Sequence, residues 1–251
     1  MDLGIEEKVA VVIAGSRGIG KATALGLARE GCAVAICARG AEALATTHAE
    51  IESLGVPAFS QACDVNDLEA LGNFLDQARD ELGSVDILVN NASAFAFGAD
   101  PEDWQKSFSV DLVAAVHATE HVLPWMIESG GGSIVHVSST AALEAPGPPA
   151  YSALKAALLS HAKNVAVAQA ANGIRINCIT PGAVEFPGGI WEGARKDNPE
   201  AYQSMLGTIP AGRMVTDTEV ADAIIFATSQ RASGMTGAVL SVDLAQHKGN
   251  L

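Results

Sequence analysis

Short apolar segments alternate with longer amphipathic segments along almost the whole chain, and this alternation constrains the fold more than any other feature. Continuous apolar runs are typical of strands buried on both faces, and strand–helix repeats favour parallel strands. The apolar segments are Val9–Ala14, Ala33–Cys37, Ala58–Ala62, Ile87–Val89, Ile134–Val137, Arg175–Ile179 and Val239–Val242. The predicted helices are Ile19–Glu30, Glu42–Leu54, Asp67–Leu82, Pro101–Ile127, Tyr151–Ala170 and Thr218–Thr228. We therefore expect an α/β fold with a doubly wound, predominantly parallel sheet and helices on both faces.

A single domain is expected over residues 1–251, because 49% of the residues are hydrophobic and a chain of this length can bury one large core. The segment Pro187–Arg213 interrupts the alternation with glycine, proline, tryptophan and charge, and it is too long for an ordinary connection. We predict that this insertion, at about residues 187–213, covers the substrate. Apolar lining, with core packing as the alternative, is expected from Phe186, Ile190, Trp191, Met205 and Leu206.

The charge balance limits the partners of this chain. Its formal net charge is -14, from 15 Lys and Arg against 29 Asp and Glu, and no basic run reverses that field locally. Nucleic acid is not expected as a partner, because the protein would repel a phosphate backbone. No apolar run has the length of a membrane span, so no membrane partner is expected either. The cysteines and histidines show neither metal-ligand nor disulfide-scaffold spacing, so we expect no metal and a cytoplasmic location.

A glycine-rich loop, Gly15-Ser16-Arg17-Gly18-Ile19-Gly20, directly follows the first apolar segment and opens the first helix. Glycines permit a tight turn and let the backbone approach a pyrophosphate, while the free N–H groups and the dipole of the helix attract it. The loop therefore predicts a dinucleotide site. A turn that merely joins strand to helix is the alternative reading.

The end of the second apolar segment bears on which dinucleotide would bind. It reads Cys37-Ala38-Arg39, and in this fold it lies beside the adenosine ribose. A carboxylate there would favour NAD, but Ala38 occupies the expected place. Arg39 and Arg17 could instead bind a 2′-phosphate through charge-assisted hydrogen bonds, so NADP(H) is the expected cofactor. The alternative is that both arginines are solvated surface charges.

Candidate catalytic groups lie in the second half of the chain. Tyr151 and Lys155 are four residues apart at the start of a long helix, so they share one face. A nearby ammonium favours the phenolate, which makes acid–base catalysis by a tyrosine feasible near neutral pH. Just upstream, the segment Gly132–Ser139 delivers hydroxyls to the carboxyl end of a strand, where doubly wound folds bind ligands.

These motifs and two others, Asn90-Asn91-Ala92 and Pro181-Gly182, occur in the order found in the short-chain dehydrogenase/reductase family. The chain resembles that family, including its 3-oxoacyl-ACP reductase-like members, over essentially its full length. The glycine loop resembles the family's Gly-x-x-x-Gly-x-Gly pattern. The resemblance implies a Rossmann-type fold and an enzyme that moves a hydride between a nicotinamide and a carbonyl or secondary alcohol. It also implies a homo-oligomer, with a tetramer expected.

By this resemblance Tyr151 exchanges a proton with the substrate oxygen, Lys155 binds the nicotinamide ribose and tunes the tyrosine, and a serine orients the carbonyl. The spacing to the tyrosine picks Ser138, whereas alignment of the strand picks Ser139, which we favour; the choice stays open. The other cofactor contacts implied by the resemblance are Asp64, Val65, Asn91, Ala92, Pro181, Gly182 and Val184, in addition to the glycine loop. A turn-forming role is an equal alternative for Asp64.

Four departures from the family pattern bear on the chemistry. We align Ala14 with a usual threonine, Ser93 with a usual glycine, and Asp243-Leu244-Ala245 with a usual Asp-Gly-Gly. Asp111 replaces an asparagine that helps to hold a relay water behind the lysine. A carboxylate there could stabilise the ammonium of Lys155 or weaken its effect on the tyrosine. A noncatalytic NADP-binding protein, serving as a redox sensor or a scaffold, is therefore the rival hypothesis.

Overall fold

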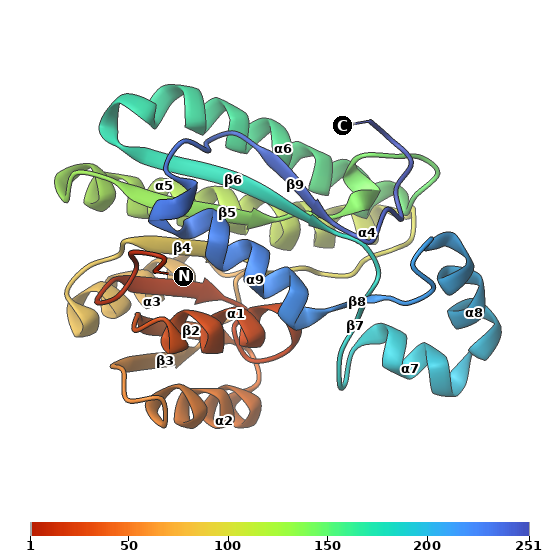
Figure 1. Cartoon of the computed structure of the whole chain (residues 1–251), viewed down its shortest axis with the longest axis horizontal. Coiled ribbons are helices and arrows are strands. Elements are labelled where there is room, and N and C mark those ends of the chain that lie inside the picture. The colour runs from red at the N-terminus through yellow and green to blue at the C-terminus, as the bar shows by residue number, and fades with distance from the viewer. Residues whose placement is uncertain (1, 251) are drawn as a thin grey trace.

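The computed structural model describes residues 2–250, which form a central sheet of seven parallel strands (Figure 1). The strand order is β3-β2-β1-β4-β5-β6-β9. The order reverses between β1 and β4, which is the switch point where folds of this kind bind ligands at the carboxyl ends of the strands. The strands are β1 (Val9–Ile13), β2 (Ala33–Ala38), β3 (Ala58–Ala62), β4 (Ile87–Asn90), β5 (Gly132–Val137), β6 (Ile174–Pro181) and β9 (Val239–Val242).

Helices cover both faces of the sheet and bury two apolar cores (Figure 1). Leu71, Phe74 and Val122 belong to the core on one face, and Leu27 and Ile224 to the core on the other. One face carries α3 (Leu68–Leu82), α5 (Ala114–Glu128) and α6 (Pro149–Gln169); the other carries α1 (Gly18–Arg29), α2 (Ala41–Glu52) and α9 (Asp217–Thr228). The expected single-domain, doubly wound α/β fold is confirmed. No helix within residues 2–250 has the length and apolar character to cross a bilayer.

Burial on both faces was expected for every strand, and this is wrong for the two outer ones. Residues of β3 are partly exposed, and those of β9 alternate between exposed and partly buried. Both strands have a neighbour on one side only. They lie at the borders of the sheet, where the covering helices no longer enclose them.

The predicted helix Pro101–Ile127 is helical throughout but is not α-helical along its whole length. It consists of α4 (Pro101–Ser107), a π-helical stretch over Phe108–Val113, and α5. A π-helical turn is wider than an α-helical one and often marks a functional site. Here it contains Asp111, whose side chain is fully buried.

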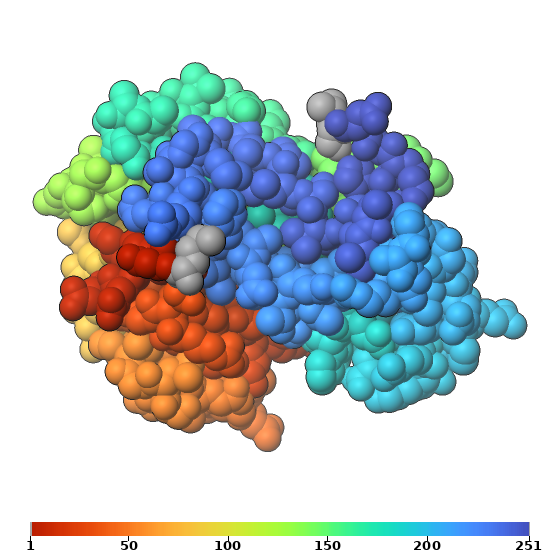
Figure 2. All heavy atoms as spheres, in the orientation of Figure 1, coloured from red at the N-terminus to blue at the C-terminus, as the bar shows by residue number. Residues whose placement is uncertain are grey.

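The insertion folds into two helices, α7 (Ile190–Asp197) and α8 (Pro199–Thr208), which the sequence pattern did not predict. They stand between the short strands β7 (Val184–Glu185) and β8 (Val215–Thr216), which pair with each other. A small apolar core holds the unit together, and it includes Tyr202. Figure 2 shows the insertion, in light blue, projecting at one side of the molecule.

Candidate active site

The glycine loop joins β1 to α1 at the centre of the carboxyl edge. The Gly15 N–H donates to the Cys37 carbonyl at 3.0 Å, which ties the loop to β2. A side chain on Gly20 would collide with the Ala14 carbonyl, so a glycine is required where the helix approaches the strand. No side chain caps the amino end of α1. Its free N–H groups can therefore receive a pyrophosphate, as the sequence predicts.

The end of β2 carries no acidic side chain. Ala38 is partly buried there, and Arg39 beside it and Arg17 in the glycine loop are exposed. Neither arginine has an ion-pair partner in the part of the chain that the structure describes. Both guanidinium groups are therefore available to an anionic ligand.

Asn91 and Asp64 have observed roles of their own at this edge. The Asn91 amide donates to the Ala14 carbonyl at 3.1 Å, which fastens the glycine loop to the end of β4. Asp64 is exposed, and its carboxylate accepts a hydrogen bond from the Asn66 N–H at 3.0 Å. The turn-forming role of Asp64 is thus present, whereas its cofactor contact stays a prediction.

Tyr151 and Lys155 lie one turn apart on α6, as expected. The Lys155 ammonium is 5.7 Å from the centre of the Tyr151 ring, and its side chain is only 2% exposed. It donates to the Val137 carbonyl at 3.1 Å and to the Ala92 carbonyl at 3.4 Å. The ends of β4 and β5 therefore fix the lysine beneath the tyrosine.

Asp111 faces the same ammonium from the π-helical turn. Its Oδ1 lies 3.2 Å from the Lys155 Nζ, and both side chains are buried. Its Oδ2 accepts a hydrogen bond from the Ala94 N–H at 3.3 Å. The carboxylate therefore holds the lysine and the loop after β4 at once, since each of its oxygens serves one of them.

The two candidate serines differ in what their hydroxyls do. Ser138 is buried, and its hydroxyl donates to the Lys155 carbonyl at 2.8 Å, which locks α6 onto the end of β5. Ser139 is only partly buried, and its oxygen accepts from the Ala141 N–H at 3.1 Å at the start of a short 3-10 turn. The Ser139 hydroxyl proton has no acceptor within residues 2–250, so it remains available to a substrate.

The sequence reasoning missed the loop after β4. Phe97 packs edge-on against the Tyr151 ring, with centroids 5.3 Å apart, and Phe95 packs against Phe97. The available signal was two phenylalanines in a short segment between the Asn-Asn-Ala motif and a helix.

Known proteins resemble this chain over nearly its whole length. Residues 13–244 match a family model described as enoyl-(acyl carrier protein) reductase. A 3-oxoacyl-[acyl-carrier-protein] reductase from Thermotoga maritima is 33% identical over 244 residues, covering 95% of this chain and 97% of the relative. The chain belongs to the short-chain dehydrogenase/reductase family. It is therefore an oxidoreductase that acts on CH–OH groups and the corresponding carbonyls.

Solved structures of this family superpose over nearly the whole chain. A 7α-hydroxysteroid dehydrogenase complexed with NADH and 7-oxo glycochenodeoxycholic acid has a TM-score of 0.90 at 30% identity, covering 97% of this chain and 96% of its own. L-Sorbose reductase from Gluconobacter frateurii, complexed with NADPH and L-sorbose, has a TM-score of 0.89 at 31% identity, covering 99% and 100%. The neighbours thus include complexes with either nicotinamide cofactor.

The alignment of Ala14 with a threonine of the family is corrected by its backbone. Ala14 has a φ of 58°, in the left-handed region that favours glycine. Only two residues separate Gly15 from Gly18, so Ala14, not Gly15, completes the wider first gap of the family pattern. Ala14 therefore stands in the place of the first glycine.

The segment Asp243-Leu244-Ala245, where the family usually has Asp-Gly-Gly, forms its turn without glycine. Leu244 and Ala245 have φ values of 54° and 60°, again in the left-handed region. The turn brings the Gln246 side-chain oxygen within 2.7 Å of the Ala183 N–H, beside Gly182. The segment after β6, which is predicted to lie against the nicotinamide, is thereby held in place.

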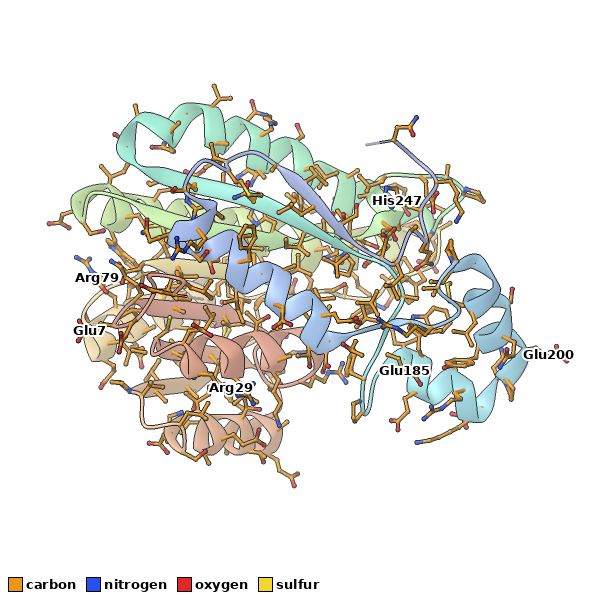
Figure 3. All side chains as sticks on the ribbon, in the orientation of Figure 1. Glu7, Arg29, Arg79, Glu185, Glu200 and His247 are labelled. Atoms are coloured by element: carbon orange, nitrogen blue, oxygen red, sulfur yellow. The ribbon has the colours of Figure 1, made fainter. Side chains whose placement is uncertain are left out.

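Glu185 joins this segment to the insertion (Figure 3). Its carboxylate accepts a hydrogen bond from the Tyr202 hydroxyl of α8 at 3.0 Å and lies 3.1 Å from the Arg195 guanidinium of α7. Both helices of the insertion are therefore fastened to the residue that follows Val184.

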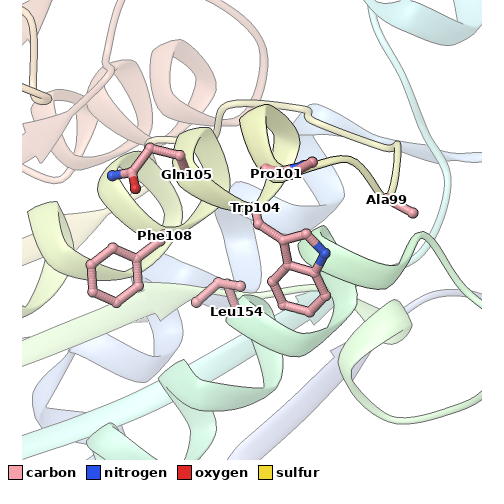
Figure 4. Close-up of a pocket in the computed structure, with 6 residues that line it drawn as sticks. All are labelled: Ala99, Pro101, Trp104, Gln105, Phe108 and Leu154. Atoms are coloured by element: carbon pink, nitrogen blue, oxygen red, sulfur yellow. The ribbon is translucent and has the colours of Figure 1, made fainter.

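An open apolar groove lies between α4 and α6 (Figure 4). Its volume is about 600 Å³, and none of Ser139, Tyr151 and Lys155 lines it. The lining residues are Ala99, Pro101, Trp104, Gln105, Phe108 and Leu154. The groove is therefore distinct from the candidate catalytic residues.

Proposed function

We propose that the chain is an NADP(H)-dependent oxidoreductase that transfers a hydride between the nicotinamide and a small carbonyl compound or secondary alcohol. The observation that carries the cofactor preference is Ala38 at the end of β2, with Arg39 next to it in the chain and Arg17 in the glycine loop. Neither arginine has an ion-pair partner among residues 2–250. Two free guanidinium groups suit a 2′-phosphate, and the overall negative charge makes such placed cations necessary.

The cofactor would lie along the carboxyl edge of the sheet. The uncapped end of α1 supports this placement, because its N–H groups lack partners that a pyrophosphate would supply. The residues proposed to hold the cofactor are Gly15, Ser16, Arg17, Gly18, Ile19, Gly20, Arg39, Asp64, Val65, Asn91, Ala92, Tyr151, Lys155, Pro181, Gly182 and Val184.

In the proposed reaction the bound nicotinamide supplies or accepts the hydride. The Tyr151 hydroxyl gives its proton to the substrate oxygen as negative charge develops there, or takes it back in the oxidative direction. The Ser139 hydroxyl donates a hydrogen bond to the same oxygen and so orients the carbonyl, while it keeps its own proton. Lys155 is held against Tyr151 by three strand-end and helix contacts, so its charge acts from a fixed position.

The rival hypothesis, a noncatalytic NADP-binding sensor or scaffold, rests on Asp111 and Ser93. Both residues make contacts that support the site: Asp111 pairs with Lys155, and the Ser93 hydroxyl oxygen accepts from the Phe95 N–H at 3.3 Å. The catalytic reading is therefore favoured.

The experiment follows NADPH absorbance against a panel of ketones, aldehydes and oxoacyl thioesters, beside a titration of NADPH binding. Turnover is expected, and Tyr151→Phe should lower kcat by about 10²–10⁴-fold with NADPH binding retained, because only the proton donor is lost. Tyr202→Phe is the comparison variant: it removes the chain's other phenol hydroxyl, which binds Glu185 in the insertion, so its effect should fall on KM rather than on kcat. Binding without turnover on the panel would support the sensor or scaffold; full activity of Tyr151→Phe would refute the role of Tyr151.

Three further expectations remain proposals. The insertion at residues 187–213 covers a small-molecule substrate. Its attachment through Glu185 supports this, because it connects the insertion to the segment proposed to bind the cofactor. The protein is cytoplasmic, as its four unpaired buried cysteines suggest. It forms a homo-oligomer, with a tetramer expected.

A further inference from the structure

Two phenylalanines of the loop after β4 are unusually exposed for side chains of this size. Phe95 and Phe97 each keep 46% of their surface in contact with solvent. Their ring centroids are 6.0 Å apart with planes at 69°, and Phe97 meets Tyr151 at 5.3 Å with planes at 80°. The three rings thus form a continuous edge-to-face row that ends at the candidate proton donor.

The row is built into the loop at a conformational cost. Phe95 has a φ of 50°, a left-handed conformation that bulky residues rarely adopt. Two hydrogen bonds hold it: the Phe95 N–H donates to the Ser93 hydroxyl at 3.3 Å, and the Ala94 N–H donates to Asp111 at 3.3 Å. Ala96, between the two phenylalanines, is buried and pins the loop to the body of the protein.

The same carboxylate therefore fixes both Lys155 and the aromatic loop. Because strain of this kind persists where the surroundings enforce it, it points to a functional role for the exposed rings. A substrate oxygen within reach of the Tyr151 hydroxyl brings the groups attached to its carbonyl carbon beside Phe97. Apolar groups placed there would remove both phenyl rings from water.

We propose that Phe95 and Phe97 form an aromatic wall of the substrate site, and that the preferred substrate carries a flat or cyclic apolar group next to its reacting carbonyl or carbinol carbon. This inference rests on the proposed function. Rings stack or meet edge-on with phenyl groups, whereas a flexible chain loses rotational freedom when it is held against them. Phe97 is accordingly a specificity-determining residue.

The test compares acetophenone with 2-octanone, a ketone with a phenyl group and a linear ketone with the same number of carbon atoms. Phe97→Ala should lower the ratio of their kcat/KM values by about tenfold or more, which is the range that apolar pocket contacts provide. Phe97→Leu keeps apolar bulk but not the flat face, and should lower the ratio less. Phe226→Ala is the matched control, since Phe226 is a 40% exposed phenylalanine on α9, across the sheet from α6.

An unchanged ratio, or an equal loss for both ketones, would overturn the aromatic wall. A change in sedimentation of Phe97→Ala with an unchanged ratio would show that a second copy covers the rings, which also overturns it. Saturation-transfer NMR of acetophenone with the NADP⁺-loaded protein gives a readout without turnover, because neither acetophenone nor NADP⁺ can give a hydride to the other. Loss of that signal in Phe97→Ala but not in Phe226→Ala would support the aromatic wall. If the wild-type chain reduced neither ketone, that lack of turnover would count against the proposed function and not against the wall.

Discussion

Arg39 and Arg17 differ from most other cations of this chain, because they are exposed at a predicted ligand site and have no acidic partner within residues 2–250. In a molecule with a net charge of -14, unpaired guanidinium groups offer an anion the local attraction that the overall field denies it. Ala38 leaves room beside them, where a carboxylate would have repelled a phosphate.

We therefore expect NADPH to bind more tightly than NADH. Arg39→Ala should raise the Kd for NADPH by about 10–100-fold, since a charge-assisted hydrogen bond contributes about 1.5–3 kcal/mol. Combining it with Ala38→Asp should reverse the preference. Isothermal titration with both cofactors measures this, and Arg29→Ala, at the far end of α1, is the control (Figure 3). Equal affinities in the unaltered protein would contradict the assignment.

At single positions, the sequence located the polar groups of the candidate site better than it predicted unusual backbone conformations. Tyr151 and Lys155 lie together because helical spacing alone places them so. Alignment of the strand favoured Ser139 over Ser138, and the engagement of the Ser138 hydroxyl with α6 supports that choice. The left-handed backbone of Ala14 was missed, because non-glycine residues adopt it only where the surrounding structure enforces it.

Elements whose pattern is local were predicted within a few residues. Strands β3 and β9 match the expected ranges, and α6 differs by one or two residues at its ends. The π-helical turn was missed because its sequence, Phe108–Val113, has no proline or glycine to interrupt a helix. The pair β7–β8 was missed because its strands are two residues long and depend on a contact across the insertion.

Histidines at the interface of β5 and α6 give the fold a pH dependence. The His136 Nε2 and His161 Nδ1 lie 3.0 Å apart, and the Asn90 amide lies 3.1 Å from the His136 Nδ1. Burial first, and then the charges of His161 and Lys155, lower the pKa of His136 from 6.5 to about 3. The unfolded chain therefore binds a proton at this residue below pH 6.5, while the native protein does not until about pH 3.

The free energy of unfolding should consequently fall as the pH drops from 6.5 toward 3, by at most about 1.4 kcal/mol per pH unit from this residue. Urea denaturation between pH 6.5 and 5 keeps the contribution of carboxylates small, since they ionise with pKa values near 4 in unfolded chains. Burial also lowers the pKa values of His161 and His117, which contribute in the same direction, so the effect of His136 is read from the difference between variant and wild type. His136→Gln should flatten the slope relative to the wild type. Identical slopes in the two proteins would show that His136 is not the source.

For the whole molecule, apolar side chains are left exposed on the helical layer that contains α4 to α6. Val167 is 77% exposed, Phe108 48% and Ile127 43%, and the groove beside Trp104 adds to them. Large apolar side chains exposed on one layer favour an interaction site there. A second copy of the same chain would cover it, since most soluble oligomers are homo-oligomers.

We expect sedimentation at micromolar concentration to show a homo-oligomer, namely a tetramer. Phe108→Glu should shift it toward smaller species, because a charge would be buried in the interface. Added salt should strengthen the association, since it screens the repulsion between chains of net charge -14. A stable monomer under these conditions would remove the oligomer while leaving the catalytic assignment untouched.

The turns at the amino ends of β5 and β6 are packed more tightly, backbone against backbone, than parts of the loops that carry Phe97 and the insertion. At the amino ends of β5 and β6, a side chain on Gly131 would lie 2.8 Å from the Gly173 carbonyl, and one on Gly173 would lie 2.9 Å from the Gly130 carbonyl. In the loop that carries Phe97, the atoms nearest to a side chain on Gly98 belong to the side chain of Asp103, and a side chain on Gly193 or Gly207 of the insertion would meet nothing within 4 Å. A lineage of such chains can thus exchange one set of metabolites for another by changing these loops, while inheriting the opposite edge almost unaltered.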